Sequence, residues 1–229
     1  MSAVHSASRR RHLRLSFFLF LILGFHVGVW AVQLGSLSAA LRLDPGELGT
    51  ALSGSAAGGI VTLFLGGRIA DRFGRRAVLL LGFGVTGAAF AGLAAARSFP
   101  EVLVAVVLYG LAVSFVDLGA NAVGSDFESA YDAHALTGLQ AGFSLGALLG
   151  ALSCALVLAA GLDYRLVYLA LGTVFALTAV VCGRASLPVR RRTNASDEAL
   201  LPAPGVRRSP GVLFAAALLL IVLPRKDAR

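Results

Sequence analysis

Six stretches of this sequence are each long and apolar enough to cross a lipid bilayer as a helix. A spanning helix needs roughly 20 mostly apolar residues, because the hydrocarbon core is about 30 Å thick. The fold class that we expect is therefore all-α, that of a polytopic membrane protein. The expected spans cover residues 15–41, 48–69, 77–96, 102–124, 135–160 and 166–183.

The composition argues against the main alternatives. Hydrophobic residues make up 57% of the chain and charged residues 14%, against about 45–50% and about 25% in ordinary soluble domains. This apolar excess does not fit a soluble fold, a disordered chain or a nucleic-acid-binding protein, even though the net charge is +8. Cys154 and Cys182 lie in apolar runs and indicate neither a disulfide framework nor a zinc site. We expect no metal and no cofactor.

Turn-forming residues separate the spans. Asp44, Pro45 and Glu47 have the pattern of a helix start, with Asp as the N-cap, Pro at the first helical position and Glu at the third. Residues 98–101 repeat this pattern, and residues 161–163 predict a tight break before the sixth span.

Arginine is distributed unevenly between the links. Fourteen loop and tail arginines fall on the side that holds the N-terminus and the links after the second and sixth spans, and three fall on the other side. Because positive charge marks the cytoplasmic side, we expect the N-terminus in the cytoplasm and the protein in the plasma (cell inner) membrane. The link at residues 125–134 is an exception, with three acids and no Lys or Arg. A signal peptide is the alternative at the N-terminus, but the apolar run is too long for one.

A seventh apolar run, residues 212–223, has only 12 residues and predicts the opening of a helix that the chain does not finish. We therefore expect a basic cytoplasmic tail, a six-helix bundle, a cytoplasmic linker, and a truncated seventh helix with its tail. These parts cover residues 1–14, 15–183, 184–210 and 211–229.

The most specific motif lies in the link between the second and third spans, where residues 67–76 have the form G-x-x-x-D-R-x-G-R-R. Gly67 would let the end of the second span approach a neighbouring helix closely, and Gly74 permits a turn with positive φ. Asp71 is an acceptor among donors and can pair with an arginine or cap a helix. The candidate gating residues are Gly67, Asp71, Arg72, Gly74, Arg75 and Arg76.

This loop resembles the signature of the major facilitator superfamily of secondary transporters, which has it between the same two helices. The resemblance implies two six-helix bundles with the substrate held between them, of which this chain supplies the N-terminal bundle and an incomplete seventh helix. It also implies that the matching Asp and arginines help to lock the cytoplasmic side shut. The alternative interpretation is a tight basic turn that only fixes topology.

The fourth span carries a polar stripe formed by Asp117, Asn121, Gly124 and Glu128, which share one helix face. An ionisable residue inside a membrane is costly and is by default a functional candidate. Since low dielectric disfavours the charged form, Asp117 could carry a proton at neutral pH. The alternative is a structural hydrogen bond to a neighbouring helix.

The first span carries His26, Trp30 and Gln33 on one face. This face suits the lining of a cavity, but the same residues could equally be packed in the core, with His26 bonded to a neighbouring carbonyl. The two interpretations stay open.

The fifth span has glycines four residues apart, which permits close packing of helices in lipid. Together with the stripe of the fourth span, it resembles a sugar-permease-like branch of the superfamily, in which the fifth helix has the form H-G-x-x-S-x-G. Here Gln140 stands where His is expected, so the substrate is left open. The candidate residues of a substrate or proton path are Asp117, Asn121, Glu128, His26, Trp30, Gln33 and Gln140. The predicted packing residues are Gly138, Gly142, Gly146 and Gly150.

Three classes of function follow. The first is a transporter half that moves a small solute, coupled to an ion gradient with H⁺ as the expected ion, and completed by a C-terminal half or a second copy. The second is a non-transporting subunit or an inactive remnant of a truncated transporter gene. A membrane enzyme is the weakest, because the spans contain no HExxH, CxxC or paired-acid grouping and the chain has no G-x-x-x-x-G-K-[ST] motif.

Overall fold

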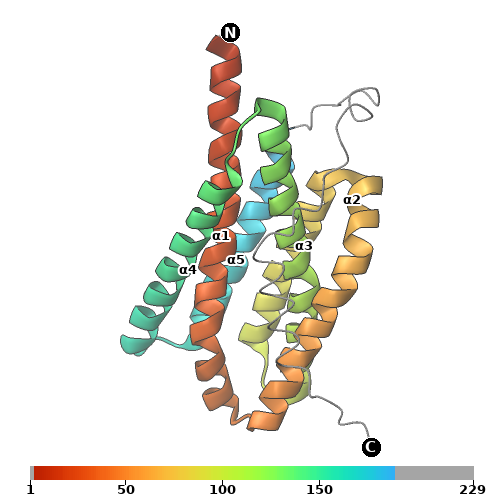
Figure 1. Cartoon of the computed structure of the whole chain (residues 1–229). Coiled ribbons are helices and arrows are strands. Elements are labelled where there is room, and N and C mark those ends of the chain that lie inside the picture. Colours follow the sequence, from red (N-terminus) through yellow and green to blue (C-terminus); the bar gives the residue numbers. More distant parts are fainter. Residues whose placement is uncertain (1–2, 189–229) are drawn as a thin grey trace, which may run out of the picture. The chain divides into compact units, whose positions relative to one another are not determined.

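The computed structural model describes residues 3–188, so the expected linker and the seventh apolar run lie outside the described residues. Within that part of the chain the structure is all-helical (Figure 1). Each helix is long and apolar enough to cross a membrane. The helices are α1 (Ala3–Leu41), α2 (Pro45–Ala95), α3 (Phe99–Tyr131), α4 (Leu136–Ala159) and α5 (Tyr164–Arg184).

Two of the expected spans form one helical element, α2, which differs from the sequence prediction. Its 51 residues would be about 76 Å long as a straight helix, more than twice the hydrocarbon thickness. The element is broken at Gly74, where φ is 80° and ψ is 167°. The expected link is therefore one non-helical residue, because the residues on both sides keep helical geometry.

The two arms of α2, residues 45–73 and 75–95, run in opposite directions along α3. In the first arm Gly58 lies at Val107 and Leu111, and Gly66 lies further along at Leu118. In the second arm the order is reversed, since Gly82 lies at Val116 and the later Gly92 at Ala105. Gly74 therefore reverses the chain (Figure 1).

Two helices are longer than expected. The predicted basic tail is helical from Ala3 and continuous with the first span, since residues 3–23 contain neither glycine nor proline to break the helix. Helix α3 continues past Gly124 to Tyr131 and ends at Asp132 in the left-handed conformation. The acidic link is therefore mostly the last two turns of a helix.

The predicted helix start at Asp44 is confirmed. Its side chain accepts a hydrogen bond from the Glu47 backbone N–H (2.8 Å), and the Glu47 side chain accepts one from the Asp44 N–H (3.1 Å). At the start of α3 the Ser98 side chain makes no capping bond, and Glu101 instead accepts the N–H of Arg97 (2.6 Å). The predicted break before α5 falls at Gly161, with φ 75°.

Small residues bring the helix backbones together. A Cβ atom at Gly24 or Gly28 of α1 would collide with the backbone of α4, and one at Gly146 or Gly150 of α4 would collide with the backbone of α1. In lipid, where no hydrophobic force draws helices together, such close contact is a main source of association.

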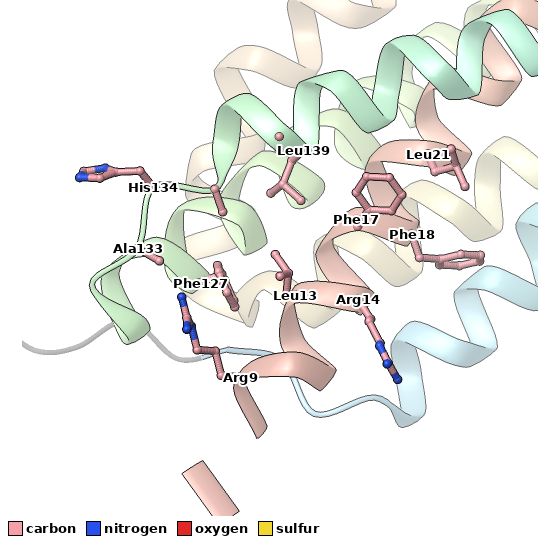
Figure 2. Close-up of a pocket in the computed structure, with 12 residues that line it drawn as sticks. Arg9, Leu13, Arg14, Phe17, Phe18, Leu21, Phe127, Ala133, His134 and Leu139 are labelled. Carbon is pink, nitrogen blue, oxygen red and sulfur yellow. The ribbon is translucent and has the colours of Figure 1, made fainter. Parts of the chain in front are cut away.

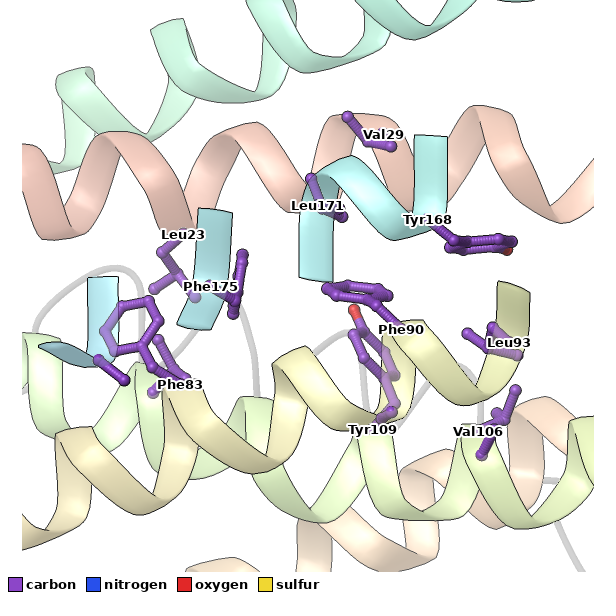
Figure 3. Close-up of a cluster of buried hydrophobic side chains, with 14 of the residues drawn as sticks. Leu23, Val29, Phe83, Phe90, Leu93, Val106, Tyr109, Tyr168, Leu171 and Phe175 are labelled. Carbon is purple, nitrogen blue, oxygen red and sulfur yellow. The ribbon is translucent and has the colours of Figure 1, made fainter. Parts of the chain in front are cut away.

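An aromatic cluster fills the space between α1, α2, α3 and α5 (Figure 3). Phe90 lies at its centre, with ring centroids 5.5 Å from those of Tyr109 and Phe175. Phe83 and Tyr168 extend the cluster and are fully buried. Aromatic pairs with tilted or edge-to-face rings stabilise packing beyond the burial of their area.

Candidate functional site

The loop signature lies at one end of the bundle, together with the first turns of α1, the last turns of α3 and the residues after α5. We call this the basic end. Arg75 forms an ion pair with Asp126 of α3, with Nε 2.5 Å from Oδ2 and Nη2 3.2 Å from Oδ1. Asp126 is only 4% exposed. Arg76 donates to the carbonyl of Ala185, just beyond α5 (2.7 Å).

The other signature residues are less enclosed. Asp71 is exposed, and within residues 3–188 it has no hydrogen bond or ion pair, so neither Arg75 nor Arg76 is its partner here. Arg72 is also exposed and lies over the Phe73 ring, 5.4 Å from its centroid. Gly67 has open space where a Cβ would lie, so the close approach expected there falls one residue earlier, at Gly66 against Leu118.

Glu128, predicted as part of a solute or proton path, lies at the start of α4. Its Oε1 accepts the backbone N–H groups of Ala135 (2.5 Å) and Leu136 (2.8 Å). The N-cap residue of α4, Ala135, has no side-chain oxygen of its own. Glu128 therefore supplies from α3 the acceptor and negative charge that a helix N-terminus requires.

A second junction at the basic end was not predicted. The His12 ring joins the Tyr131 hydroxyl through Nδ1 (2.8 Å) and lies 3.5 Å from the Ser186 hydroxyl through Nε2. His12 is 9% exposed. These bonds hold the first turns of α1 against α3 and the residues after α5.

Of the first-span candidates, His26 and Gln33 are completely buried. The Nε2 atom of His26 lies 3.2 Å from the Tyr109 hydroxyl, and its ring contacts Phe175 edge-on. Trp30 stacks on Tyr109 with centroids 4.3 Å apart. These residues belong to the core cluster, which favours the packing interpretation.

The remaining first-span candidate also contacts the bundle interior. Gln33 donates from Nε2 to the Tyr164 carbonyl at the start of α5 (2.8 Å). This bond joins α1 to α5 near the end of the bundle opposite the basic end.

Asp117 and Asn121 lie elsewhere, on an outward surface of α3. Asn121 donates from Nδ2 to the Asp117 carboxylate (3.0 Å) and to its carbonyl (2.9 Å). The pair lines a groove of about 520 Å³ with Ser114 and with Gly59 and Leu63 of the first arm of α2. Asp117 is exposed, so part of the predicted polar stripe opens to the outside of this bundle.

A sequence model of the Major Facilitator Superfamily matches residues 15–224. The chain belongs to this superfamily. Two uncharacterized MFS-type transporters of Mycobacterium tuberculosis, from strains H37Rv and CDC 1551, are each 32% identical to it over 162 residues. That alignment covers 68% of this chain but only 37% of each relative.

The candidate residues of the expected fifth span lie on α4. Gln140 is exposed, and its carbonyl accepts a bond from the Ser144 hydroxyl (3.2 Å). It is not among the residues that line the Asp117 groove. Gly142, like Gly146 and Gly150, faces α1, where a Cβ would meet the Phe17 ring, whereas Gly138 has open space around it.

Within residues 3–188 no group of three or more His, Cys, Asp or Glu side chains could hold a metal ion. The contacts at the basic end that the sequence prediction missed are those of Asp126 with Arg75 and of His12 with Tyr131. A signal for Asp126 was present, because the acidic link at residues 125–134 interrupts an otherwise basic side.

Proposed function

We propose that this chain is one bundle of a secondary active transporter for a small solute, coupled to a proton gradient. The observation that carries the proposal is the outward-facing pair Asp117 and Asn121. A carboxylate that faces lipid within a span is costly. Asp117 lies about two turns inside the expected end of its span at Gly124 and Asn121 about one turn inside it, so a polar or water-filled surface must cover them.

A second bundle supplies that cover, as a C-terminal half or as a second copy of this chain. Apolar residues beside the groove suit such an interface, since Ile60 is 55% exposed and Leu63 72% exposed. Helix pairs from two bundles around a polar path at mid-membrane are the general arrangement of secondary transporters. The groove would then be one wall of the solute path, with Asp117 as the proton-carrying acid.

The basic end acts as the cytoplasmic gate in this proposal. The ion pair of Arg75 with Asp126 and the bond from Arg76 to Ala185 fix the Gly74 turn on its own bundle. Asp71 and Arg72 remain exposed beside it and are available to the second bundle. The Arg-rich side faces the cytoplasm and the protein lies in the plasma membrane, with six spans in residues 15–183 because each arm of α2 crosses once.

The competing function is a non-transporting membrane subunit or the inactive remnant of a transporter. Both functions have the same bundle, so they differ only in whether a second bundle completes it.

Proton flux separates the two. Vesicles containing this chain, with and without a co-expressed C-terminal half of a relative, are loaded with a pH-sensitive dye and given a panel of small solutes. A transporter half gives solute-dependent proton flux when the second bundle is present. Flux that is absent in both preparations, in protein shown to be folded and assembled, would contradict transport.

A further inference from the structure

A groove at the basic end is lined on one side by α1 and on the other by the α3–α4 connection and the start of α4 (Figure 2). Its volume is about 690 Å³. It is separate from the Asp117 groove, with which it shares no residue. Neither the proposed solute path nor the gate uses it.

The wall of this groove is apolar and open. Leu13, Phe17 and Phe18 of α1 line it and are 39%, 39% and 37% exposed, with Leu139 of α4 facing them. Gly138, in the first turn of α4, also lines the groove, and no atom lies within 4 Å of the position that a Cβ would take there.

The charged side chains that line the groove, Arg9 and Arg14, are basic. Arg9 extends toward Phe127, whereas Arg14 and His134 lie at its edges (Figure 2). Among the described residues, no Asp or Glu lines it. Glu128, next to Phe127 of the lining, accepts the backbone N–H groups of Ala135 and Leu136.

An apolar wall with a basic mouth, at the end of a membrane-spanning bundle, matches one kind of molecule. The geometry points to a binding site for an anionic phospholipid of the surrounding bilayer. Its phosphate would lie at Arg9, with Arg14 at the edge of the groove, and one acyl chain would lie along the exposed side chains of Leu13, Phe17 and Phe18. A basic residue near an anionic headgroup contributes about 1 kcal/mol, or about fivefold in affinity.

Native mass spectrometry of the full chain in detergent tests the site, with phosphatidylglycerol and phosphatidylcholine of the same acyl chains as probes. We expect tighter binding of phosphatidylglycerol, weakened about 25-fold in Arg9→Gln/Arg14→Gln. The matched control is Arg10→Gln/Arg11→Gln, which removes the same charge from the same helix at positions that do not line the groove. The control should keep most of the binding.

A second variant tests the groove rather than the charge. Gly138→Leu puts a side chain at a position where a Cβ would meet no atom within 4 Å, so it should reduce binding of phosphatidylglycerol and leave the folded protein intact. Inorganic phosphate at millimolar concentration should not displace the lipid. Equal binding of both lipids, equal losses in the two arginine pairs, or displacement by phosphate alone would overturn the proposal. None of these readouts depends on transport.

Discussion

The close contact between α1 and α4 makes a graded prediction for glycine-to-alanine substitutions. At Gly28 a Cβ would collide with the Ala147 carbonyl and lie 2.7 Å from the Ala151 nitrogen. At Gly146 it would collide with the Leu21 carbonyl and lie 2.9 Å from the Phe25 nitrogen. These neighbours are backbone atoms, which move only if the helices separate.

The size of the effect follows from two opposing contributions. Alanine favours a helix over glycine by about 1 kcal/mol in its free energy of formation. Overpacking costs about 1–3 kcal/mol, and more where the structure cannot yield. At Gly28 and Gly146 the steric cost exceeds the helix gain, so we expect each alanine variant to be destabilised by about 1–2 kcal/mol.

The chain offers matched controls on the same two helices. Gly35 on α1 and Gly138 on α4 have no atom within 4 Å of a Cβ position, so alanine there should leave stability unchanged or raise it slightly. Gly142 should be intermediate, because its Cβ would meet the flexible Phe17 side chain at 2.7 Å rather than backbone.

Each variant is purified in detergent and heated to a series of temperatures. The fraction that remains folded is then measured by fluorescence-detected gel filtration. We expect the order Gly28 and Gly146 least stable, then Gly142, then Gly35 and Gly138. If Gly146→Ala were as stable as Gly138→Ala, the close backbone contact between α1 and α4 would be wrong.

Three further predictions concern the basic end and the topology. Asp126→Asn should lower the free energy of unfolding by about 1–3 kcal/mol, because it leaves Arg75 without its charged partner. Asp71→Asn should change it by less than about 0.5 kcal/mol. Equal unfolding temperatures for the two variants would contradict this prediction. Glu128→Ala should lower the free energy of unfolding by about 0.5–2 kcal/mol through loss of the α4 cap. Glu128→Gln should keep most of that stability, because an acceptor remains. If both variants unfolded at the same temperature as the native chain, Glu128 would not be a stabilising cap. Tags at the N-terminus and at residues 190–192 should be inaccessible from outside intact cells. Labelling of either tag from outside would contradict the predicted orientation.

Much of the fold could be predicted because span length, end signals and turn residues are local properties. The Asp44 helix start and the positive φ of Gly74 depend on residues within one turn. Periodicity also showed that His26 and Trp30 share a face, but it could not show which neighbour that face meets. That neighbour is Tyr109, 83 residues from His26, and only the packing of α1 on α3 brings it there.

The candidate site was less predictable for the same reason. Asp71 was predicted either to pair with an arginine or to cap a helix, yet Arg75 pairs with Asp126, which is 51 residues away. The stripe on α3 was predicted as one functional face, but its ends differ in surroundings. Asp117 opens outward, whereas Glu128 is held by the start of α4. Helix periodicity predicts which residues share a face of one helix. It does not predict which other helix, or which solvent, that face contacts.

The most direct test of the account is whether Asp117 carries the coupled proton. In vesicles that contain this chain with a second bundle, Asp117→Asn should abolish gradient-driven accumulation of the transported solute and keep its exchange, because exchange requires no net proton movement. Asp132→Asn, which removes an exposed carboxylate at the end of the same helix and outside the groove, is the control and should retain accumulation. Gradient-driven accumulation by well-folded Asp117→Asn protein would contradict the account.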